Sequence, residues 1–376
     1  MTDEPIGRRV ARWRLRRRMT QQMLADRLGK SKSWVDKVER GVRALDRYSV
    51  LQEIAEVLRI HPTVLLGEER PQPEARPPAG VDRIRAALAR YDVSRTPPAG
   101  EVQRHVEHAW LTYGYAHYAH LVRLLPDLLD AARSLRAELP EMPVQVYRIT
   151  SSVLVKLGEA DLGWLAADRA MTAAGDEPLL AGAAALSVGQ ALRALGRDRL
   201  ALAVTLAAAP RDVPVGALHG TLLLQAALAA ASSGDARRAD GLIDRAAEIA
   251  SRPRCDDDRH RTSFGPVAVE LARVVAAVEL GDAGAAVCRH ERVNRHDGWR
   301  ALPAEYRGAY LLDAARAYLQ AGDLRGAGRT LVEADGVAPA EVRWRPVART
   351  LVAEIARRHP APAGVARLAA SVGLMC

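Results

Sequence analysis

Residues 20–41 (TQQMLADRLGKSKSWVDKVERG) constrain the fold of this chain most strongly, because they predict two short helices joined by a tight turn. Thr20 and Ser31 each stand just before a helical pattern, where a side-chain oxygen can accept a hydrogen bond from an unpaired backbone N–H group. Gly29 can end the first helix. The apolar residues at helical spacing, which we expect to pack the two helices together, are Leu24, Ala25, Leu28, Val35 and Val38. The segment therefore predicts a helical hairpin with a defined angle.

The second helix of this hairpin keeps a polar face. The side chains expected on its exposed side are Lys32, Ser33, Asp36 and Lys37. Such a face can reach base edges in the major groove of DNA, where each base pair presents its own donors and acceptors. The alternative is a hairpin that only packs, or one that binds protein. The caps, the glycines, the polar face and a basic flank agree with one another, so we favour DNA.

Eleven positions of the segment resemble the signature of the XRE (Cro/C1-type) helix-turn-helix family. They are Gln21, Leu24, Ala25, Leu28, Gly29, Ser31, Val35, Val38, Glu39, Arg40 and Gly41, and the resemblance extends from about Ile6 to Gly67. It implies a five-helix, lambda-repressor-like domain in which Gln21 touches a phosphate while Lys32 and Ser33 read bases. Lys30 and Trp34 depart from the family pattern, where a small apolar residue and a smaller aromatic or aliphatic residue are common.

The predicted DNA-binding residues comprise the two caps, the exposed face of the second helix and the polar residues that flank it. They are Thr20, Gln21, Lys30, Ser31, Lys32, Ser33, Trp34, Asp36, Lys37, Arg40 and Arg43. The preceding segment adds a run of arginines that are candidates for phosphate contacts, namely Arg14, Arg16, Arg17 and Arg18. The alternative for such a run is a solvated face.

Positive charge is concentrated around the hairpin. The chain carries a net charge of +9, whereas residues 8–47 alone carry +10, from 14 Arg or Lys and 4 Asp or Glu. A local excess of positive charge is expected when one domain contacts nucleic-acid phosphates and the remainder of the chain does not. The excess of arginine over lysine indicates a GC-rich genome, yet three of the few lysines, Lys30, Lys32 and Lys37, lie in or beside the second helix of the hairpin.

The 376 residues are enough for two domains, and a hydrophobic content of 49% supports a packed core. Before the hairpin we expect a helix that begins at Pro5 and buries Ile6, Val10 and Trp13; after it we expect another over Ser49–Leu58. A proline-rich stretch of little apolar content follows, as is typical of an extended linker. The predicted parts are a helix-turn-helix domain at 1–67, the linker at 68–80 and a helical-repeat domain at 81–376.

The region after the linker is predicted to be all α, because it is rich in Ala and Leu with helical periodicity. Five glycines end apolar helical segments at spacings of 38, 38, 47 and 41 residues: Gly158, Gly196, Gly234, Gly281 and Gly322. Five residues after each comes a small residue: Gly163, Ala201, Ala239, Ala286 or Ala327. A glycine permits the turn between antiparallel helices, and a small residue permits their close approach. These segments resemble the turn of the tetratricopeptide repeat, whose unit is about 34 residues, so we expect a degenerate, TPR-like α-solenoid.

A window rich in aromatic residues and histidine marks a candidate effector pocket in the repeat region. Trp110, Tyr113 and His117 share one predicted helical face, with Tyr118 nearby. Effector sites are usually apolar with a few placed polar groups. The alternative, which aromatic stripes at helical spacing favour, is ordinary core packing. The same question arises for a set on a later helix, Trp164, Asp168 and Arg169.

Other site chemistries find little support. The three cysteines are widely separated, which fits a reducing cytoplasm and neither a zinc site nor a disulfide framework. The cluster Cys255, Asp256, Asp257, Asp258 and His260 contains metal-type ligands, but neighbours in a charged loop rarely converge on one ion. We find no catalytic or cofactor-binding motif, no signal-peptide core and no apolar run of membrane length. We therefore expect a cytoplasmic protein that is not an enzyme and has no metal, cofactor or membrane partner.

The order of head, linker and repeats resembles a family of actinobacterial regulators and, more distantly, the peptide-sensing quorum regulators of Gram-positive bacteria. The sequence thus favours a transcription regulator that inserts the helix from Ser31 to Arg40 into the major groove. Heads of this type usually bind two half-sites about 34 Å apart, so we expect a homodimer on a pseudo-palindromic operator. The repeats, which commonly expose a concave groove, would dimerise and bind a small-molecule or peptide effector. The alternatives are a protein-interaction adaptor with weak, non-specific DNA tethering, or an enzyme with a DNA-binding head, which no residues support.

Overall fold

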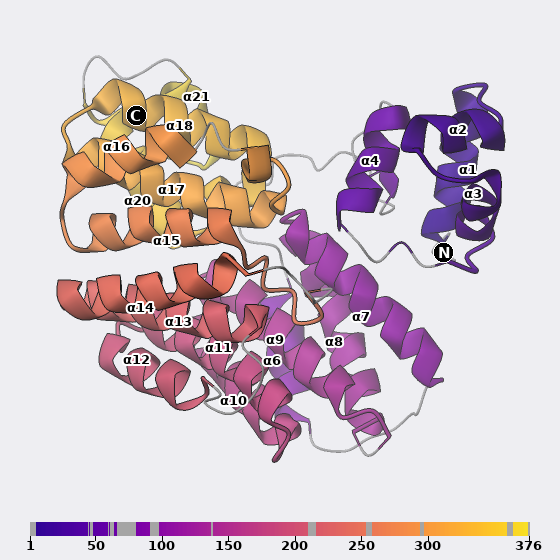
Figure 1. Ribbon diagram of the computed structural model, residues 1–376, viewed down its shortest axis with the longest axis horizontal. Coiled ribbons are helices and arrows are strands. Elements are labelled where there is room, and N and C mark those ends of the chain that lie inside the picture. The colour runs from indigo at the N-terminus through magenta and orange to yellow at the C-terminus, as the bar shows by residue number, and fades with distance from the viewer. Residues whose placement is uncertain are drawn as a thin grey trace.

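Helices account for the regular structure of the chain, as its periodicity predicts. The computed structural model describes residues 5–43, 45, 48–58, 60, 64–65, 80–90, 98–136, 138–209, 216–252, 258–293, 297–358 and 364–374. Within these ranges there is no strand (Figure 1). The predicted linker at 68–80 lies outside the described residues except for Gly80.

Four short helices form the N-terminal head. They are α1 (Ile6–Arg16), α2 (Gln21–Leu28), α3 (Lys32–Glu39) and α4 (Tyr48–Leu58). Of the predicted fifth helix, only Val64 and Leu65 are described, and both are helical. One buried apolar cluster joins the four helices to Leu65, with Val10, Leu24, Ala25, Val35, Val38, Leu51, Ile54, Ala55 and Leu58 among its members. The predicted packing of the hairpin helices against each other is confirmed.

Close approach of α1 to α3 depends on Gly7, a residue that the sequence pattern did not single out. A Cβ atom at this position would lie 2.0 Å from the carbonyl oxygen of Val38. Because the obstructing atom belongs to backbone, no side-chain rotation can relieve such a contact. Gly7 therefore sets how α1 is placed on the second helix of the hairpin.

The body, residues 80–374, is built of helices throughout its described length. They are α6 (Val81–Ala89), α7 (Ala99–Gly114), α8 (Tyr118–Ser134), α9 (Glu141–Lys156), α10 (Ala160–Ala174), α11 (Pro178–Ala194), α12 (Asp198–Ala207), α13 (Ala217–Ser232), α14 (Ala236–Ala250), α15 (Pro266–Glu279), α16 (Ala283–Val293), α17 (Ala304–Gln320), α18 (Leu324–Val337), α19 (Pro339–Arg343), α20 (Pro346–Ala356) and α21 (Val365–Ser371). A short 3-10 helix spans Asp297–Trp299.

The five glycines expected at repeat turns all occupy such turns. Each separates the two helices of a pair, from α9 and α10 to α17 and α18, and each has a positive φ, where a residue with a Cβ is strained. The φ angles are 86° at Gly158, 67° at Gly196, 83° at Gly234, 79° at Gly281 and 81° at Gly322. The prediction of a helical repeat is confirmed.

The small residues five positions later are all buried against the first helix of the pair. The four alanines among them expose at most 1% of their surface. At Gly163 a Cβ would lie 2.8 Å from Cγ2 of Val155 and 3.2 Å from the carbonyl oxygen of Ser151. Close packing within each pair therefore requires a side chain no larger than a methyl group, and in the first pair none at all.

The first helices of the pairs form an inner row. In chain order α7, α9, α11, α13, α15 and α17 each contact the next, while the outer row consists of α10, α12, α14, α16 and α18. The inner row closes on itself, because α17 also contacts α7. Closure narrows the concave side that stacked helix pairs usually leave open, and it brings the two ends of the body together.

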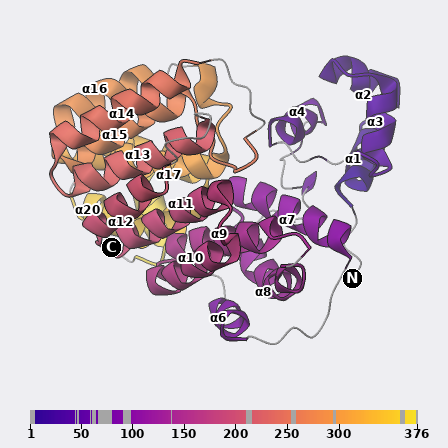
Figure 2. The ribbon, with the colours of Figure 1, turned by 60° about the horizontal axis from the view of Figure 1, so that its bottom comes forward.

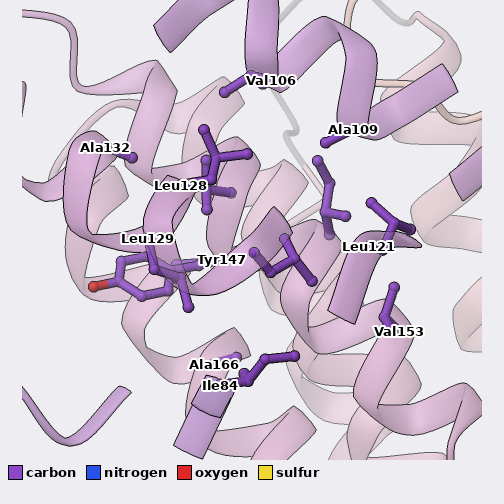
Figure 3. Close-up of a cluster of buried hydrophobic side chains, with 14 of the residues drawn as sticks. Ile84, Val106, Ala109, Leu121, Leu128, Leu129, Ala132, Tyr147, Val153 and Ala166 are labelled. Atoms are coloured by element: carbon purple, nitrogen blue, oxygen red, sulfur yellow. The ribbon is translucent and has the colours of Figure 1, made fainter. Parts of the chain in front are cut away.

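The start of the body has its own apolar core, part of which Figure 3 shows. Ile84 of α6, Leu128 and Leu129 of α8, and Val153 of α9 lie in this buried cluster. Ala340 of α19 belongs to the same cluster although it is nearly 200 residues further along the chain. Apolar packing, which is the main stabilising term in folding, thus joins the first helices of the body to the last.

Candidate nucleic-acid interface and interior of the body

Both predicted helix caps of the hairpin form. Oγ1 of Thr20 accepts a hydrogen bond from the backbone N–H of Met23 at 3.1 Å, and Oγ of Ser31 accepts one from that of Trp34 at 3.1 Å. Gly29 ends α2 in the left-handed conformation, with φ at 62°. These local bonds fix the turn between α2 and α3 and so determine which side chains of α3 face outward.

The outward face of α3 is open to solvent in the full chain. The predicted DNA-binding residues that are exposed are Thr20, Lys30, Ser31, Lys32, Ser33, Lys37, Arg40 and Arg43, and those that are half-buried are Gln21, Trp34 and Asp36. Asp36 pairs with Arg40 at 3.1 Å, and the Arg43 guanidinium lies 5.9 Å from the centre of the Trp34 ring. Figure 1 shows α3 on the side of the head away from the body. Eight of the eleven predicted residues are therefore exposed, and the other three are half-buried.

Arg14 is a structural residue, which corrects its candidacy for a phosphate contact. It is buried, and its Nε and Nη2 donate to Oε1 and Oε2 of Glu39 at 2.6 and 3.0 Å, while Nη1 donates to the carbonyl oxygen of Met19 at 2.7 Å. Gln21 donates its Nε2 hydrogen to the same Oε2 of Glu39 at 2.9 Å. Through these bonds Glu39 of α3 is joined to Arg14 of α1 and to Gln21 at the start of α2, which holds the three helices together. Of the other arginines in the run, Arg17 donates to the carbonyl oxygen of Leu58 at 2.9 Å.

Three of the four residues predicted in the aromatic window of the body, Trp110, Tyr113 and Tyr118, lie in contact with one another. The ring centres of Trp110 and Tyr113 are 5.9 Å apart, as are those of Tyr113 and Tyr118, whereas His117 lies against Tyr115. The second predicted set, Trp164, Asp168 and Arg169, lies on α10 of the outer row, where Trp164 exposes 45% of its surface. The two sets therefore belong to different layers of the body.

A buried ion network links this window to the end of the chain. Nζ of Lys156 on α9 lies 2.5 Å from Oε1 of Glu305 on α17 and 2.8 Å from Oε1 of Glu341 on α19. Oε2 of Glu341 also accepts a bond from Arg345 at 2.9 Å, and the Glu341 side chain is fully buried. Tyr118 donates its hydroxyl hydrogen to the same carboxylate. The sequence pattern did not predict this network, because its members are up to 223 positions apart.

The pKa values in the network match these contacts. Burial raises the pKa of Glu341, but the positive charges of Lys156 and Arg345 outweigh burial and lower it below the ordinary value. Burial, together with the nearby carboxylates, raises the pKa of Tyr118 well above 10. The carboxylate therefore stays charged and the phenol stays protonated, so each keeps the form that its hydrogen bonds require.

Several buried polar groups of the inner-row helices, and one of the loop before α15, lack a hydrogen-bond partner. The buried side-chain atoms without a hydrogen-bond partner include Nε of Arg148, Oγ of Ser151, Nε of Arg193, Nδ1 of His219, Oε1 of Gln225, Nδ1 of His260 and Nε of Arg307. All lie on helices of the inner row or on the loop that precedes α15. Buried polar groups are usually paired, and two of these exceptions, on Arg148 and His260, belong to residues that are hydrogen-bonded to each other.

Two further sequence expectations concern metals and membranes. In the described part of the chain, no three His, Cys, Asp or Glu side chains gather as ligands of one ion would. Cys255, Asp256 and Asp257 lie outside the described residues. Among the described helices, none has the length and apolar character that crossing a bilayer demands.

His290 on α16 is expected to make the stability of the protein depend on pH. Its Nδ1 lies 2.9 Å from the Tyr310 hydroxyl, and burial lowers its pKa below 6.5. The unfolded chain therefore binds a proton here before the folded chain does, so stability is lost as pH falls through 6.5 toward the folded-state value. Chemical denaturation between pH 7.5 and 5.5 should show a smaller loss of unfolding free energy for His290→Gln than for the wild type. Equal losses would contradict this role, and His105→Gln, at an exposed histidine, is the matched control.

Comparison with known proteins identifies the head. Residues 5–66 match the family described as "Helix-turn-helix domain", so the hairpin of α2 and α3 is part of such a domain. No curated protein matches the chain by sequence. Among solved structures, the chain is similar to the crystal structure of Bacillus thuringiensis PlcR in complex with the peptide PapR7 and DNA. The sequences are 11% identical, the alignment covers 90% of this chain and 99% of that one, and the TM-score is 0.38.

Proposed function

We propose that this protein is a sequence-specific, DNA-binding transcription regulator. The observation that carries the proposal is the accessible face of α3, on which Lys32, Ser33 and Lys37 are exposed at the end of a capped helix-turn-helix. Lysine and serine side chains can donate to base edges, and the basic surroundings neutralise phosphate charge. The predicted residues that flank this face, from Thr20 to Arg43, would fix the register of the head on the duplex.

The rest of the chain would serve dimerisation and control. We assign residues 1–67 to an XRE-type domain, 68–80 to a linker and 81–376 to a body of degenerate tetratricopeptide-type repeats. A homodimer of such heads would place two copies of α3 in successive major grooves of a pseudo-palindromic operator. An effector bound inside the body would act by preferring one arrangement of the two heads.

Selection of bound fragments from random double-stranded DNA tests the proposal directly. We expect a two-fold symmetric motif to be enriched over successive rounds, because each subunit would read the same half-site. Recovery of fragments without a shared motif would overturn sequence-specific recognition.

Substitutions in the head should separate base reading from phosphate contact. Lys32→Ala or Ser33→Ala is expected to change base preference, at about 1–3 kcal/mol for the affected base pair. Gln21→Ala should instead weaken all sites alike. Binding to the selected motif and to each single-base variant measures both effects.

Arg27→Ala is the charge-matched control for Lys32→Ala, since each removes one positive charge from the head. Arg27 is exposed on α2, beside Glu53 and Glu56 of α4. Its replacement should leave base preference unchanged. Because Gln21 also contacts Glu39, thermal unfolding of each variant must accompany the binding data. Identical binding profiles for Lys32→Ala and Gln21→Ala would refute the assigned roles.

A protein-interaction adaptor is the second candidate, and exposed apolar side chains on consecutive body helices favour it. Trp164 on α10, Leu179 on α11 and Leu200 on α12 expose 45%, 40% and 57% of their surfaces. Exposed apolar side chains can mark a contact surface for another chain when they are contiguous. An adaptor with a loosely tethering head would show steep salt dependence of DNA binding without discrimination between sequences.

A further inference from the structure

The loop of residues 258–264 reaches across the inner side of the body. It precedes α15, yet Nη2 of Arg148 on α9 donates a hydrogen bond to the carbonyl oxygen of His260 in this loop at 2.9 Å. Two helices of the inner row, α11 and α13, separate α9 from α15. Figure 1 shows the chain just before α15 extending toward α7 and α9. The loop thus occupies the interior of the ring of helices.

Local contacts hold the loop in an uncommon conformation. The Asp258 carboxylate accepts bonds from the backbone N–H and hydroxyl of Thr262 at 2.8 and 2.7 Å and from the N–H of Ser263 at 2.9 Å. Asp258, Arg261 and Ser263 have φ angles of 47°, 55° and 52°, a region that side-chain-bearing residues rarely adopt. At its end Phe264 packs on α13 so closely that no Cβ fits at Gly220. The loop is therefore anchored at both ends while its middle lies on Arg148.

Arg148 is a buried cation that makes no direct ion pair within the described residues, although burial, which lowers its pKa, is partly opposed by the nearby negative charges of Asp258 and Glu141. Its residue is 4% exposed, its Nη1 donates to Oε1 of Gln145 at 3.2 Å, and its guanidinium lies 5.2 Å from the centre of the Trp110 ring. No carboxylate in the described ranges pairs with it, and its Nε has no hydrogen-bond partner. Burial lowers the pKa of Arg148 to about 10. A desolvated guanidinium that no carboxylate contacts directly is unfavourable, even with Asp258 and Glu141 nearby, so an anion bonded to it would be stabilised.

The free edge of this guanidinium has the geometry of a carboxylate site. Nε and Nη2 point the same way and together can donate two parallel bonds to the two oxygens of one carboxylate. In the structure Nη2 is used by the His260 carbonyl and Nε is left empty. The His260 carbonyl oxygen therefore uses one of the two hydrogen-bond donors on this edge, and the other, Nε, has no acceptor.

We propose that the Nε and Nη2 edge of Arg148 binds a carboxylate group of the effector, and that the loop of residues 258–264 occupies this site in the effector-free protein. The inference rests on the effector control proposed above. The carboxylate displaces the His260 carbonyl, gains the second hydrogen bond at Nε and releases the loop. Trp110 and Gln145 both contact the guanidinium and each other, since Trp110 Nε1 donates to Gln145 Oε1 at 3.0 Å.

One residue of the site, Trp110, lies on the helix that touches the head. Trp110 belongs to α7, and the next residue, Leu111, lies in the apolar cluster of the head together with Tyr115. Figure 2 shows α7 extending beneath α4 of the head. A ligand that moves Trp110 would therefore act on the same helix that supports the head, which supplies a physical route from the site to the DNA-binding surface.

Hydrogen exchange of the full-length protein tests the proposal with acetate as the minimal carboxylate. We expect amides of residues 258–264 to exchange about fivefold faster in about 100 mM sodium acetate than in sodium chloride of equal ionic strength, because acetate binds the open state of the loop. Acetamide, which is neutral, should have no effect. In Arg148→Met the loop should exchange at one rate in all three solutions.

Two variants keep the test decisive. Arg136→Met removes an exposed arginine that also donates to a backbone carbonyl, that of Thr172 at 3.1 Å, and should respond to acetate like the wild type. Arg148→Lys keeps the charge without the paired edge and should respond less, even if Arg148→Met does not fold. Equal exchange in acetate and chloride, or a full response in both Arg148 variants, would overturn the proposal. Because the readout is the loop, such a failure leaves DNA recognition by the head to be judged by the selection experiment.

Discussion

Glu341→Ala is expected to lower the free energy of unfolding of the body by about 3–5 kcal/mol, because it removes a fully buried anion that pairs with both Lys156 and Arg345 and leaves Lys156 with Glu305 alone. Glu341 is fully buried and accepts bonds from Lys156 at 2.8 Å and from Arg345 at 2.9 Å. The loss should appear in chemical denaturation of the full chain and in amide exchange of α9 and α19, the helices that the carboxylate joins. It would show that contact between the two ends of the body stabilises the whole ring.

The matched control for Glu341→Ala is Glu354→Ala. Glu354 forms an ion pair with Arg358 at 3.1 Å, but both side chains are about half exposed, and exposed pairs contribute roughly 0–1 kcal/mol. Equal effects of the two substitutions would show that the network does not stabilise the body. Lys156→Met combined with Glu341→Leu should restore only part of the loss, since it replaces one buried ion pair by apolar side chains but leaves Glu305 and Arg345 without these partners.

The Glu341 network should also lose its stabilising effect as the pH is lowered. Burial opposes ionisation of Glu341, but Lys156 and Arg345 lower its folded-state pKa below the ordinary value of 4.5. A lowered folded-state pKa stabilises the protein above the unfolded-state value, and this contribution is lost as pH falls below 4.5. The Glu341→Leu and Lys156→Met pair should lack this part of the acid dependence.

Glu39→Ala is expected to lower the free energy of unfolding of the head by about 3–5 kcal/mol, because Arg14 then stays buried without a carboxylate. Both oxygens of Glu39 bind Arg14, and one also accepts the amide of Gln21. Amide exchange of α1 to α3 in the full chain should rise while that of the body does not. DNA binding should be lost at every sequence alike, unlike the selective effect expected for Lys32→Ala.

Asp36→Ala is the control for the stability of the head, since Asp36 of α3 pairs with Arg40, the residue after α3, and their side chains are 41% and 63% exposed. It should change the exchange of α1 to α3 little. If Glu39→Ala left this exchange unchanged, the Arg14 pair would have no role in holding α1 on α3. Arg14→Met with Glu39→Met should recover part of the stability that the single change removes.

Features that depend on neighbouring residues could be predicted from the sequence. The caps at Thr20 and Ser31 form within three residues, and the glycine at each repeat turn needs only the local backbone conformation. The arginine run shows where such reasoning stops. Four arginines looked alike, but placement of α1 on α3, which Gly7 permits, turns Arg14 inward to Glu39.

The candidate effector region was predictable only in part. The aromatic window pointed to Trp110, Tyr113 and Tyr118, which do lie together in the interior. Their polar partners could not be found in the same way. Gln145 and Glu305 carry no local motif: Gln145 approaches the window because α9 packs on α7, and Glu305 because the inner row closes and brings α17 to α7.

The amino-acid sequence by itself determined an all-α chain, a capped helix-turn-helix with a lysine-bearing outer face, and a body of helix pairs with glycine turns. These features follow from helical periodicity and from the conformational preferences of single residues, which act over a few positions. Only the tertiary structure decided that α17 meets α7, that Lys156 finds Glu305 and Glu341, and that the loop before α15 lies on Arg148. Such contacts depend on the accumulated rotation of successive repeats, to which every pair contributes and which no local segment specifies.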